Sequence, residues 1–289
     1  MSSIKTTLLS ILALLAFAAN SVLCRLALDS EQMDAANFTA IRLLSAAAIL
    51  ALALFGFARL SINKIAAQGS WKAAFYLLAY AAGFSYAYVS LPTAAGALIL
   101  FASVQFTMLA MARFSGKIMT WPENLGFGIS IAGLAYFLLP GLLGSEIDIG
   151  DISGILFMTL AGVGWGFYSL CGAKSAKPMQ DTAANFIRLT PIALVILLFS
   201  SPLTESSNQA IGYAIASGAL TSGLGYTLWY HVLPKLHTSV AAVCQLSVPI
   251  WAGLGGVLLV GEALEYHLLI SAGIILGGIL LVIFGRPRI

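Results

Sequence analysis

The sequence predicts an all-α membrane protein with ten transmembrane helices, arranged as two inverted five-helix repeats around a central cavity. Of its 289 residues, 60% are hydrophobic and only 9% are charged, whereas soluble domains contain about 25% charged residues. The chain also contains ten long apolar segments, and its two halves share a pattern of residues. Because each half has an odd number of segments, the two copies must cross the membrane in opposite directions.

The apolar segments have the length of membrane-spanning helices. A hydrocarbon core about 30 Å thick requires roughly 20 apolar residues per helix. Segments of this kind cover residues 5–24, 36–57, 72–90, 93–113, 122–140, 151–172, 183–200, 209–230, 238–260 and 266–285. We expect residues 1–140 to form the first repeat and residues 151–285 the second, inverted one.

The repeat is visible in residues that recur with nearly the same spacing. The first copy has Cys24, nine residues, and then Asp34-Ala35-Ala36-Asn37-Phe38, with Arg42 following. The second copy has Cys171, nine residues, and then Asp181-Thr182-Ala183-Ala184-Asn185-Phe186, with Arg188 following. The first segment also resembles a signal peptide, with Lys5 before an apolar stretch and a small-residue site at Ala16-Phe17-Ala18. Its match in the second half favours a membrane span instead.

The charged residues predict the orientation. Lysine and arginine are enriched in cytoplasmic loops. With the N-terminus inside, that side receives Lys5, Arg59, Lys64, Lys72, Arg113, Lys117, Lys174, Lys177, Lys235, Arg286 and Arg288. The other side receives Asp29, Glu31, Asp34, Glu146, Asp148, Asp151, Glu205, Glu262 and Glu265, with Arg25 as its clear cation. We therefore expect a multi-pass protein of the inner membrane with both termini in the cytoplasm. The sequence contains no basic, aromatic-rich patch, so we expect no nucleic-acid partner.

Aromatic and polar residues inside the segments are candidates for a binding site. Tyr76, Tyr80, Phe84 and Tyr88 follow one another at intervals of four and share one helix face, as do Ser222, Tyr226 and Tyr230. An interfacial aromatic belt explains Tyr76, Tyr88 and Tyr230, which lie near segment ends. Deeper hydroxyl groups need partners, so they tend to face protein or a cavity.

Amides and glycines extend this candidate site. Glutamine offers donors and an acceptor for an amino acid head group, although a hydrogen bond between helices is an equally open interpretation. The run Gly162-Val163-Gly164-Trp165-Gly166 permits close helix approach or bending. The residues that we expect to line the cavity and bind substrate are Asn20, Tyr80, Phe84, Phe101, Gln105, Trp165, Tyr168, Ser222, Tyr226 and Gln245.

Arg42 and Arg188 are strong charges inside apolar segments. Each lies near the start of its segment, so its side chain can extend to the nearer interface. The functional interpretation is a gating contact or a contact with a substrate carboxylate. Both interpretations remain open.

Small residues in the fifth and tenth segments suggest helix packing. Gly273 and Gly277, with Gly126 and Ser130, are typical of faces that bring helices close together. We interpret these segments as scaffold or dimer contact. A monomer or a weak homodimer is therefore expected, with a small-molecule substrate and the lipid bilayer as partners.

Three stretches of the chain resemble the drug/metabolite transporter superfamily, and specifically its EamA-type ten-helix exporters. They are Phe38 to Arg42, Trp165-Gly166-Phe167-Tyr168, and the pattern from Ala241-Ala242 through Pro249 to Gly261-Glu262. Among these exporters, the chain is most similar to those for aromatic amino acids. The resemblance implies a basket-like bundle with a central cavity lined by the first, third, fourth, sixth, eighth and ninth segments. It also implies export of amino acids or related metabolites.

Catalytic and cofactor-binding patterns are absent from the sequence, which contains no GxSxG, HExxH or phosphate-binding loop. We therefore expect no enzyme activity, no cofactor and no metal site. The favoured function is a secondary transporter that exports amino acids, with aromatic or apolar side chains, by alternating access. Alternatives are an exporter of another solute class such as drug-like cations, a membrane enzyme or assembly factor, and a channel. The missing mid-membrane carboxylate favours flux without proton coupling.

Overall fold

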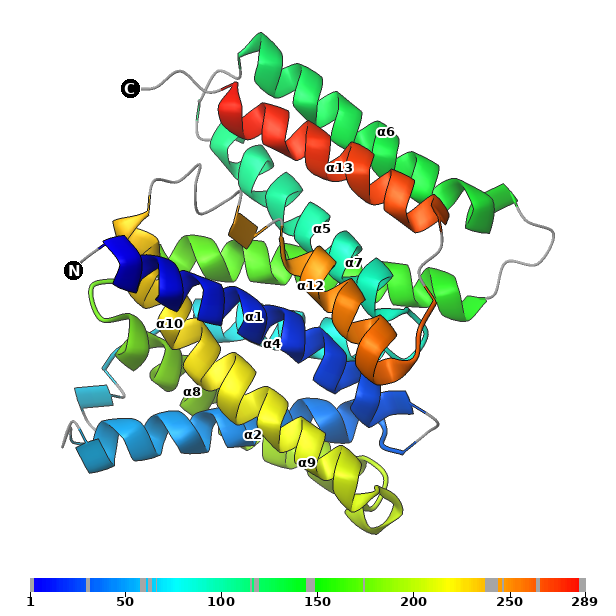
Figure 1. The fold of residues 1–289 in the computed structure, drawn as a ribbon. Helices are drawn as coiled ribbons and strands as arrows, with labels where there is room; N and C mark the ends of the chain where they lie inside the picture. The colour runs from blue at the N-terminus through cyan, green and yellow to red at the C-terminus, as the bar shows by residue number, and fades with distance from the viewer. Residues whose placement is uncertain are drawn as a thin grey trace.

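The protein is an all-helical bundle. The structure is a computed structural model, which describes residues 3–29, 32–57, 61, 64–65, 67–114, 116, 120–143, 149–173, 175–236, 244–245, 247–263 and 266–285. These residues form helices joined by short turns, and no strand occurs among them. Figure 1 shows the helices packed side by side, with α6 and α13 paired next to α5.

Each predicted segment contains a described helix. The first half forms α1 (Ser3–Leu28), α2 (Ala35–Leu52) with a π-helical extension η2 (Ala53–Phe57), α4 (Trp71–Ala87), α5 (Thr93–Phe114) and α6 (Trp121–Leu143). The second half forms α7 (Ile149–Gly172), α8 (Pro178–Phe199), α9 (Asn208–Ala216), η4 (Ser217–Leu224), α10 (Gly225–Val232), α12 (Val248–Gly255), η6 (Gly256–Val260) and α13 (Tyr266–Phe284). Short 3₁₀ turns follow α8 and α10, at Leu203–Glu205 and Leu233–Lys235. The elements α9, η4 and α10 form one unbroken helical rod.

The helices fit a membrane protein, as the sequence predicts. Five described helices are by themselves long and apolar enough to span a membrane. They are Ile4–Leu28, Ala35–Gly56, Thr93–Met111, Ile152–Gly172 and Pro178–Phe199. Part of the predicted segment 238–260 lies outside the described residues, and its described helix begins at Val248.

The packing of the helices follows the inverted repeat. Within the described chain, α2 packs against α8, α5 against α12, and α6 against α13. Each pair joins the helices at the same position of the two halves. In addition, α4 packs against α7 and the rod α9–η4–α10 packs against α1, so the third helix of each half contacts the first helix of the other. This reciprocal arrangement confirms the predicted fold class.

Glycines of α7 allow close contacts with α4 and α5. A Cβ atom at Gly164 would lie 2.9 Å from the Tyr76 carbonyl oxygen and from the Tyr80 nitrogen. A Cβ atom at Gly162 would lie 2.7 Å from the Leu100 carbonyl oxygen. Because these neighbours are backbone atoms, the helices would have to separate to accept a side chain. The glycines therefore position Trp165 at the junction of three helices.

The packing face between α6 and α13 differs in part from the prediction. No described atom lies within 4 Å of a Cβ built at Gly273 or Gly277, so these two glycines do not form the contact between α6 and α13, and a dimer contact there stays a prediction. Gly278 makes the contact instead, because a Cβ there would lie 2.7 Å from the Ser130 nitrogen and 2.6 Å from the Gly126 carbonyl oxygen. Helical neighbours are rotated by about 100°, so a one-residue difference turns the face toward another side.

Polar contacts tie the connections at both ends of the bundle. At one end, called the Glu262 end, the Asn37 amide donates to the Ser201 carbonyl at 2.8 Å and accepts from the Ser200 hydroxyl at 2.6 Å. At the other end, called the Gly69 end, the Asn185 amide oxygen accepts from the Ser70 N–H at 3.0 Å. Each asparagine thus ties the loop before the third helix of the other half.

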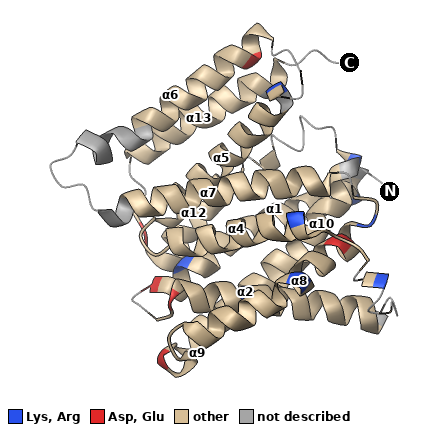
Figure 2. Ribbon diagram, turned by 180° about the vertical axis from the view of Figure 1, so that it is seen from behind, with Lys and Arg blue, Asp and Glu red and all other residues tan. Residues whose placement is uncertain are grey.

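Charged residues lie toward these two ends. Figure 2 shows acidic residues beside the starts of α2 and α9, and basic residues near the N-terminus of the chain. Described residues at the Glu262 end include Asp29, Asp34, Glu205 and Glu262, with Arg25 as a cation. Those at the Gly69 end include Lys5, Lys64, Lys72, Arg113, Lys177 and Lys235, with Glu123 and Asp181 as anions. Among the described residues, Arg42 is the charged side chain that lies between the two ends.

Candidate functional site

Arg42 lies inside the bundle and not at an interface. It is on α2 and is only 1% exposed, so its side chain does not extend to the membrane surface. The guanidinium carbon lies 4.9 Å from the centre of the Tyr80 ring and 4.8 Å from the centre of the Phe84 ring. A cation over an aromatic face is stabilised by the ring quadrupole. The third helix of the first half therefore supplies two walls of the arginine site.

Three hydroxyl groups bind the Arg42 guanidinium. Nε donates to Ser222 at 3.0 Å, and one terminal nitrogen donates to both Tyr80 and Tyr226 at 2.9 Å. The Tyr226 hydroxyl in turn donates to that of Tyr80 at 3.0 Å. The other terminal nitrogen, Nη1, is buried and makes no hydrogen bond within the described structure. Arg42 also makes no ion pair with any acidic residue that the structure describes.

Asn20 extends this network to α1. Its amide nitrogen donates to the Tyr80 hydroxyl at 3.1 Å. Its amide oxygen accepts from Ser217 at 2.6 Å and from Thr221 at 2.9 Å. All four side chains are buried, and a buried polar group is costly unless it is bonded. Both halves of the protein thus contribute to one polar cluster, defined here as the Arg42 cluster: Arg42, Asn20, Tyr80, Ser217, Thr221, Ser222 and Tyr226.

Aromatic rings surround the Arg42 cluster. The Trp165 ring centre lies 4.9 Å from that of Tyr80 and 4.6 Å from that of Tyr226. Phe186 stacks on Tyr226, with ring centres 6.2 Å apart. Tyr168 lies beside Trp165, at 5.6 Å between ring centres. The cluster is therefore a polar centre inside an aromatic wall.

The central cavity is nearly closed in this structure. A cavity of about 10 Å³ remains beside the cluster, which is room for about one water molecule. Its lining residues are Phe17, Tyr80, Phe84, Leu100, Phe101, Trp165 and Tyr226. Tyr80, Phe84, Phe101, Trp165 and Tyr226 were all expected to line it. A substrate would have to move these rings to bind here.

The structure brings most, but not all, of the expected site residues together. Gln105 is buried on α5 and its amide nitrogen has no hydrogen-bond partner among the described residues, yet it does not line the central cavity. Gln245 is buried as well and makes no described contact with the Arg42 cluster. Arg188 lies beside Gly69, at the Gly69 end of the bundle. The roles assigned to these three residues stay predictions.

The belt interpretation was wrong for two tyrosines. Tyr88 is 0% and Tyr230 4% exposed, so neither ring faces the lipid as a belt residue would. Sequence reasoning also missed Ser217 and Thr221, which bind Asn20. Their spacing of four residues places them on one helix face, and this was the signal available in the sequence.

The Glu262 end is closed by an ion pair. Arg25 Nε lies 3.1 Å from a Glu262 oxygen, and both side chains are mostly buried. Glu262 also accepts from the Thr93 N–H at 2.9 Å, while Arg25 donates to the Tyr88 carbonyl at 3.2 Å. These contacts join the end of α1, the start of α5 and the turn after η6. On this side, the bundle is tied across both halves.

These features define a class of protein. Apolar helices in two inverted halves, with a polar cluster at the crossing of the halves, are the architecture of secondary transporters. Residues 152–284 match the EamA-like transporter family. The chain belongs to this family, which lies within the drug/metabolite transporter superfamily.

Two related proteins and one solved structure are similar to most of this chain. An uncharacterised protein of Pseudomonas aeruginosa is 42% identical over 282 residues, covering 98% of this chain and 96% of that protein. A Salmonella typhimurium protein named a probable amino-acid metabolite efflux pump is 24% identical over 210 residues, covering 68% of this chain and 69% of its own. One solved crystal structure has a TM-score of 0.68 at 18% identity, covering 97% of this chain and 96% of that chain, and shares the fold.

Proposed function

We propose that this transporter exports amino acids with aromatic or apolar side chains, and related small metabolites, across the inner membrane by alternating access. One observation carries the proposal: Arg42 is a buried cation that has no acidic partner among the described residues and keeps one terminal nitrogen unbonded. A buried charge is costly unless it is paired. A substrate carboxylate would pair with it, and guanidinium and carboxylate can form two parallel hydrogen bonds.

The surroundings of Arg42 suit the remainder of an amino acid. The rings of Trp165, Phe84 and Phe101 offer an apolar surface for a side chain. Ring-to-ring contacts add about 0.5–1.5 kcal/mol beyond the burial of area. Aromatic amino acids would gain most from this wall, which agrees with the predicted similarity to aromatic amino acid exporters.

Arg42 also disfavours the alternative substrate class, drug-like cations. A drug-like cation would meet a buried positive charge at the centre, and like charges disfavour each other strongly away from water. A carboxylate-bearing solute is attracted instead.

Residues 1–140 and 151–285 are proposed as the two halves that move against each other. The Arg42 cluster draws side chains from both, which is what a site between moving halves requires. A monomer or a weak homodimer is kept as the proposed assembly.

The orientation is tested by cysteine labelling. Basic residues predict that the Gly69 end faces the cytoplasm. Lys177 and Glu205 are exposed at opposite ends of the bundle. On intact cells, an impermeant maleimide is expected to label Glu205→Cys and to spare Lys177→Cys until the cells are opened. The parent chain supplies the background from its native cysteines. Labelling of Lys177→Cys from outside would contradict the proposed orientation.

Transport is expected to need no pH gradient. The residues of the Arg42 cluster include no carboxylate and no imidazole. The affinity of the cluster for substrate is therefore not expected to change with pH near neutrality. Glu262 is engaged by Arg25, and His231 contacts Lys235 at 2.7 Å near the Gly69 end; His237 lies outside the described residues. In liposomes at equal pH on both sides, radiolabelled phenylalanine is expected to flow down its own gradient.

Protein-free liposomes give the leak rate for this measurement. Phenethylamine, which lacks the carboxylate, is expected to move at least about tenfold more slowly than phenylalanine through the protein, because a hydrogen bond to a charged group is worth roughly 1.5–3 kcal/mol. Flux that appears only when a proton gradient is imposed would contradict the uncoupled mechanism. Equal flux of the two compounds would contradict the carboxylate site.

A further inference from the structure

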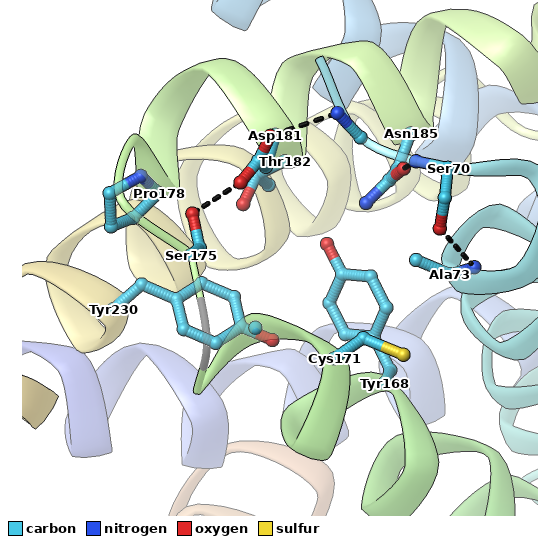
Figure 3. A pocket seen from close by; sticks show the side chains of 12 residues that line it. Ser70, Ala73, Tyr168, Cys171, Ser175, Pro178, Asp181, Thr182, Asn185 and Tyr230 are labelled. Atoms are coloured by element: carbon cyan, nitrogen blue, oxygen red, sulfur yellow. Dashed lines mark hydrogen bonds between the residues drawn. The ribbon is translucent and has the colours of Figure 1, made fainter.

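A second and larger cavity lies at the Gly69 end. It has a volume of about 200 Å³, and the start of α4, the end of α7, the start of α8 and Tyr230 of α10 form its walls (Figure 3). The lining residues are Gly69, Ser70, Ala73, Tyr168, Cys171, Gly172, Ser175, Pro178, Asp181, Thr182, Asn185 and Tyr230. Tyr168 lines this cavity and lies beside Trp165, whose ring contacts Tyr226 of the Arg42 cluster.

The cavity is rich in hydrogen-bond acceptors and carries one negative charge. Asp181 is its acidic lining residue, and no lysine or arginine is among the described lining residues. One Asp181 oxygen accepts from the Gly69 N–H at 2.8 Å and the other from the Ser175 hydroxyl. Each carboxylate oxygen can accept a further hydrogen bond. The side chain is thus held in place and still able to bind a donor.

Tyr230 directs an unused hydroxyl into this cavity. Its side chain is only 4% exposed, and its hydroxyl has no hydrogen-bond partner among the described residues. The Tyr168 ring centre lies 6.0 Å away, and its hydroxyl lies beside Thr182 and Asn185 (Figure 3). Gly172 makes room for this arrangement, because a Cβ there would lie 2.6–2.7 Å from the phenol end of Tyr230. A buried, unbonded hydroxyl in a polar cavity indicates a missing ligand group.

The positively charged side chains nearby are not among the described lining residues. The start of α8 carries the positive end of the helix dipole, but Pro178 has no N–H and Asp181 adds a full negative charge within the first turn. Arg188 Nη1 would lie 2.9 Å from a Cβ atom at Gly69, and Arg188 is not among the described lining residues. An anion would therefore meet the Asp181 carboxylate directly, whereas a cation would meet acceptors and two aromatic faces.

We infer that this cavity is a second binding site, which takes the protonated amino group of an amino-bearing substrate before the substrate reaches the Arg42 cluster. Asp181 supplies the charge, the Tyr230 hydroxyl an acceptor, and the Tyr168 and Tyr230 rings cation–π surface. The inference rests on the proposed transport of amino acids. The two sites bind opposite ends of a zwitterion: the cavity at the Gly69 end binds the ammonium group, and Arg42 binds the carboxylate.

Cys171 lines the cavity and provides the test. In the purified full-length protein with Cys24→Ala and Cys244→Ala, Cys171 is labelled with N-ethylmaleimide and the rate is followed by mass spectrometry. Phenethylamine has the ammonium and ring without the carboxylate, and 3-phenylpropionate has the carboxylate without the ammonium. At ten times its half-protecting concentration, phenethylamine is expected to slow labelling about tenfold by simple occupancy. The same concentration of 3-phenylpropionate is expected to leave the rate unchanged.

Two variants probe the assigned groups. Asp181→Asn keeps a hydrogen-bonding side chain of the same shape and is expected to raise the half-protecting concentration of phenethylamine at least about tenfold, through loss of a charge-assisted contact. Tyr230→Phe removes only the unbonded hydroxyl and is expected to weaken protection about threefold to tenfold. The matched control is Glu205→Gln, which removes a carboxylate at the opposite end and is expected to behave like the parent.

Each result bears on the inference. Protection by 3-phenylpropionate as strong as that by phenethylamine, absence of protection by either compound, or unchanged protection in Asp181→Asn would each overturn it. Failure of the proposed function gives a different result. If Arg42→Gln transports phenylalanine at the parent rate while phenethylamine still protects Cys171, the carboxylate site is wrong and the amino-group site stands.

Discussion

Replacing Arg42 with glutamine is expected to lower phenylalanine transport in liposomes by about a hundredfold or more. Truncating one partner of a buried, hydrogen-bonded charge pair costs about 2–5 kcal/mol, and the neutral amide leaves the substrate carboxylate without its counter-charge. Arg42→Lys keeps the charge but loses the planar pair of donors, so its phenylalanine flux is expected to lie between that of the parent and that of Arg42→Gln. The measurement is the flux of radiolabelled phenylalanine at equal pH on both sides, compared among the parent, Arg42→Gln and Arg42→Lys.

The same variant is expected to behave unusually in a stability measurement. Arg42 is a buried charge that makes no ion pair within the described structure, so its removal relieves a desolvation cost in the substrate-free protein. We expect Arg42→Gln to unfold at a temperature equal to or above that of the parent, and to lose the thermal stabilisation that phenylalanine gives. Arg113→Gln, at an exposed position, is the matched control. Lower stability with unchanged relative transport would show that Arg42 only holds the helices together.

The polar centre was largely predictable because helical periodicity determines which residues share a face. Tyr80 and Phe84 are four residues apart, as are Ser222 and Tyr226, and such pairs lie on one side of a helix. A hydroxyl deep in an apolar segment must then turn toward protein. The repeat places these two helices in corresponding positions, so their polar faces meet at the centre.

The two arginines show where reasoning from the repeat fails. Arg42 lies five residues after Asn37, but Arg188 lies three residues after the matching Asn185. A difference of two positions turns a side chain by about 200° around a helix. Arg42 therefore points to the centre, whereas Arg188 lies beside Gly69 at the end of the bundle. A shared motif predicts a shared helix but does not predict a shared direction.

The glutamines were unpredictable for a related reason. Gln105 has no polar residue three or four positions away in α5, so the sequence does not indicate which helix face it occupies. Gln105 is buried on α5, yet Phe101 and not Gln105 borders the central cavity. The tight contact of η4 with α2 was also invisible, because a glycine in a sequence does not show which backbone it approaches.

Gly218→Ala is expected to disrupt the site without replacing any residue that is proposed to bind substrate. A Cβ at Gly218 would overlap with the Ser45 hydroxyl and the Arg42 carbonyl oxygen, and would lie 2.9 Å from the Arg42 carbonyl carbon. Backbone atoms cannot turn away, so η4 must move off α2. Such overpacking costs about 1–3 kcal/mol, occasionally more. Since η4 carries Ser217, Thr221 and Ser222, the displacement separates them from their partners.

We therefore expect Gly218→Ala to lower phenylalanine flux in liposomes at least about tenfold, since the loss of even one hydrogen bond that orients a charged group is worth roughly 1.5–3 kcal/mol. The overpacking itself is expected to lower the unfolding temperature. Gly212→Ala, on the same rod, is the matched control. No described atom lies within 4 Å of a Cβ there, and alanine favours a helix over glycine by about 1 kcal/mol. That variant should transport normally and be at least as stable as the parent. If both variants behave alike, the close contact between α2 and η4 does not set the geometry of the Arg42 cluster, and the helices tolerate a wider separation than the structure shows.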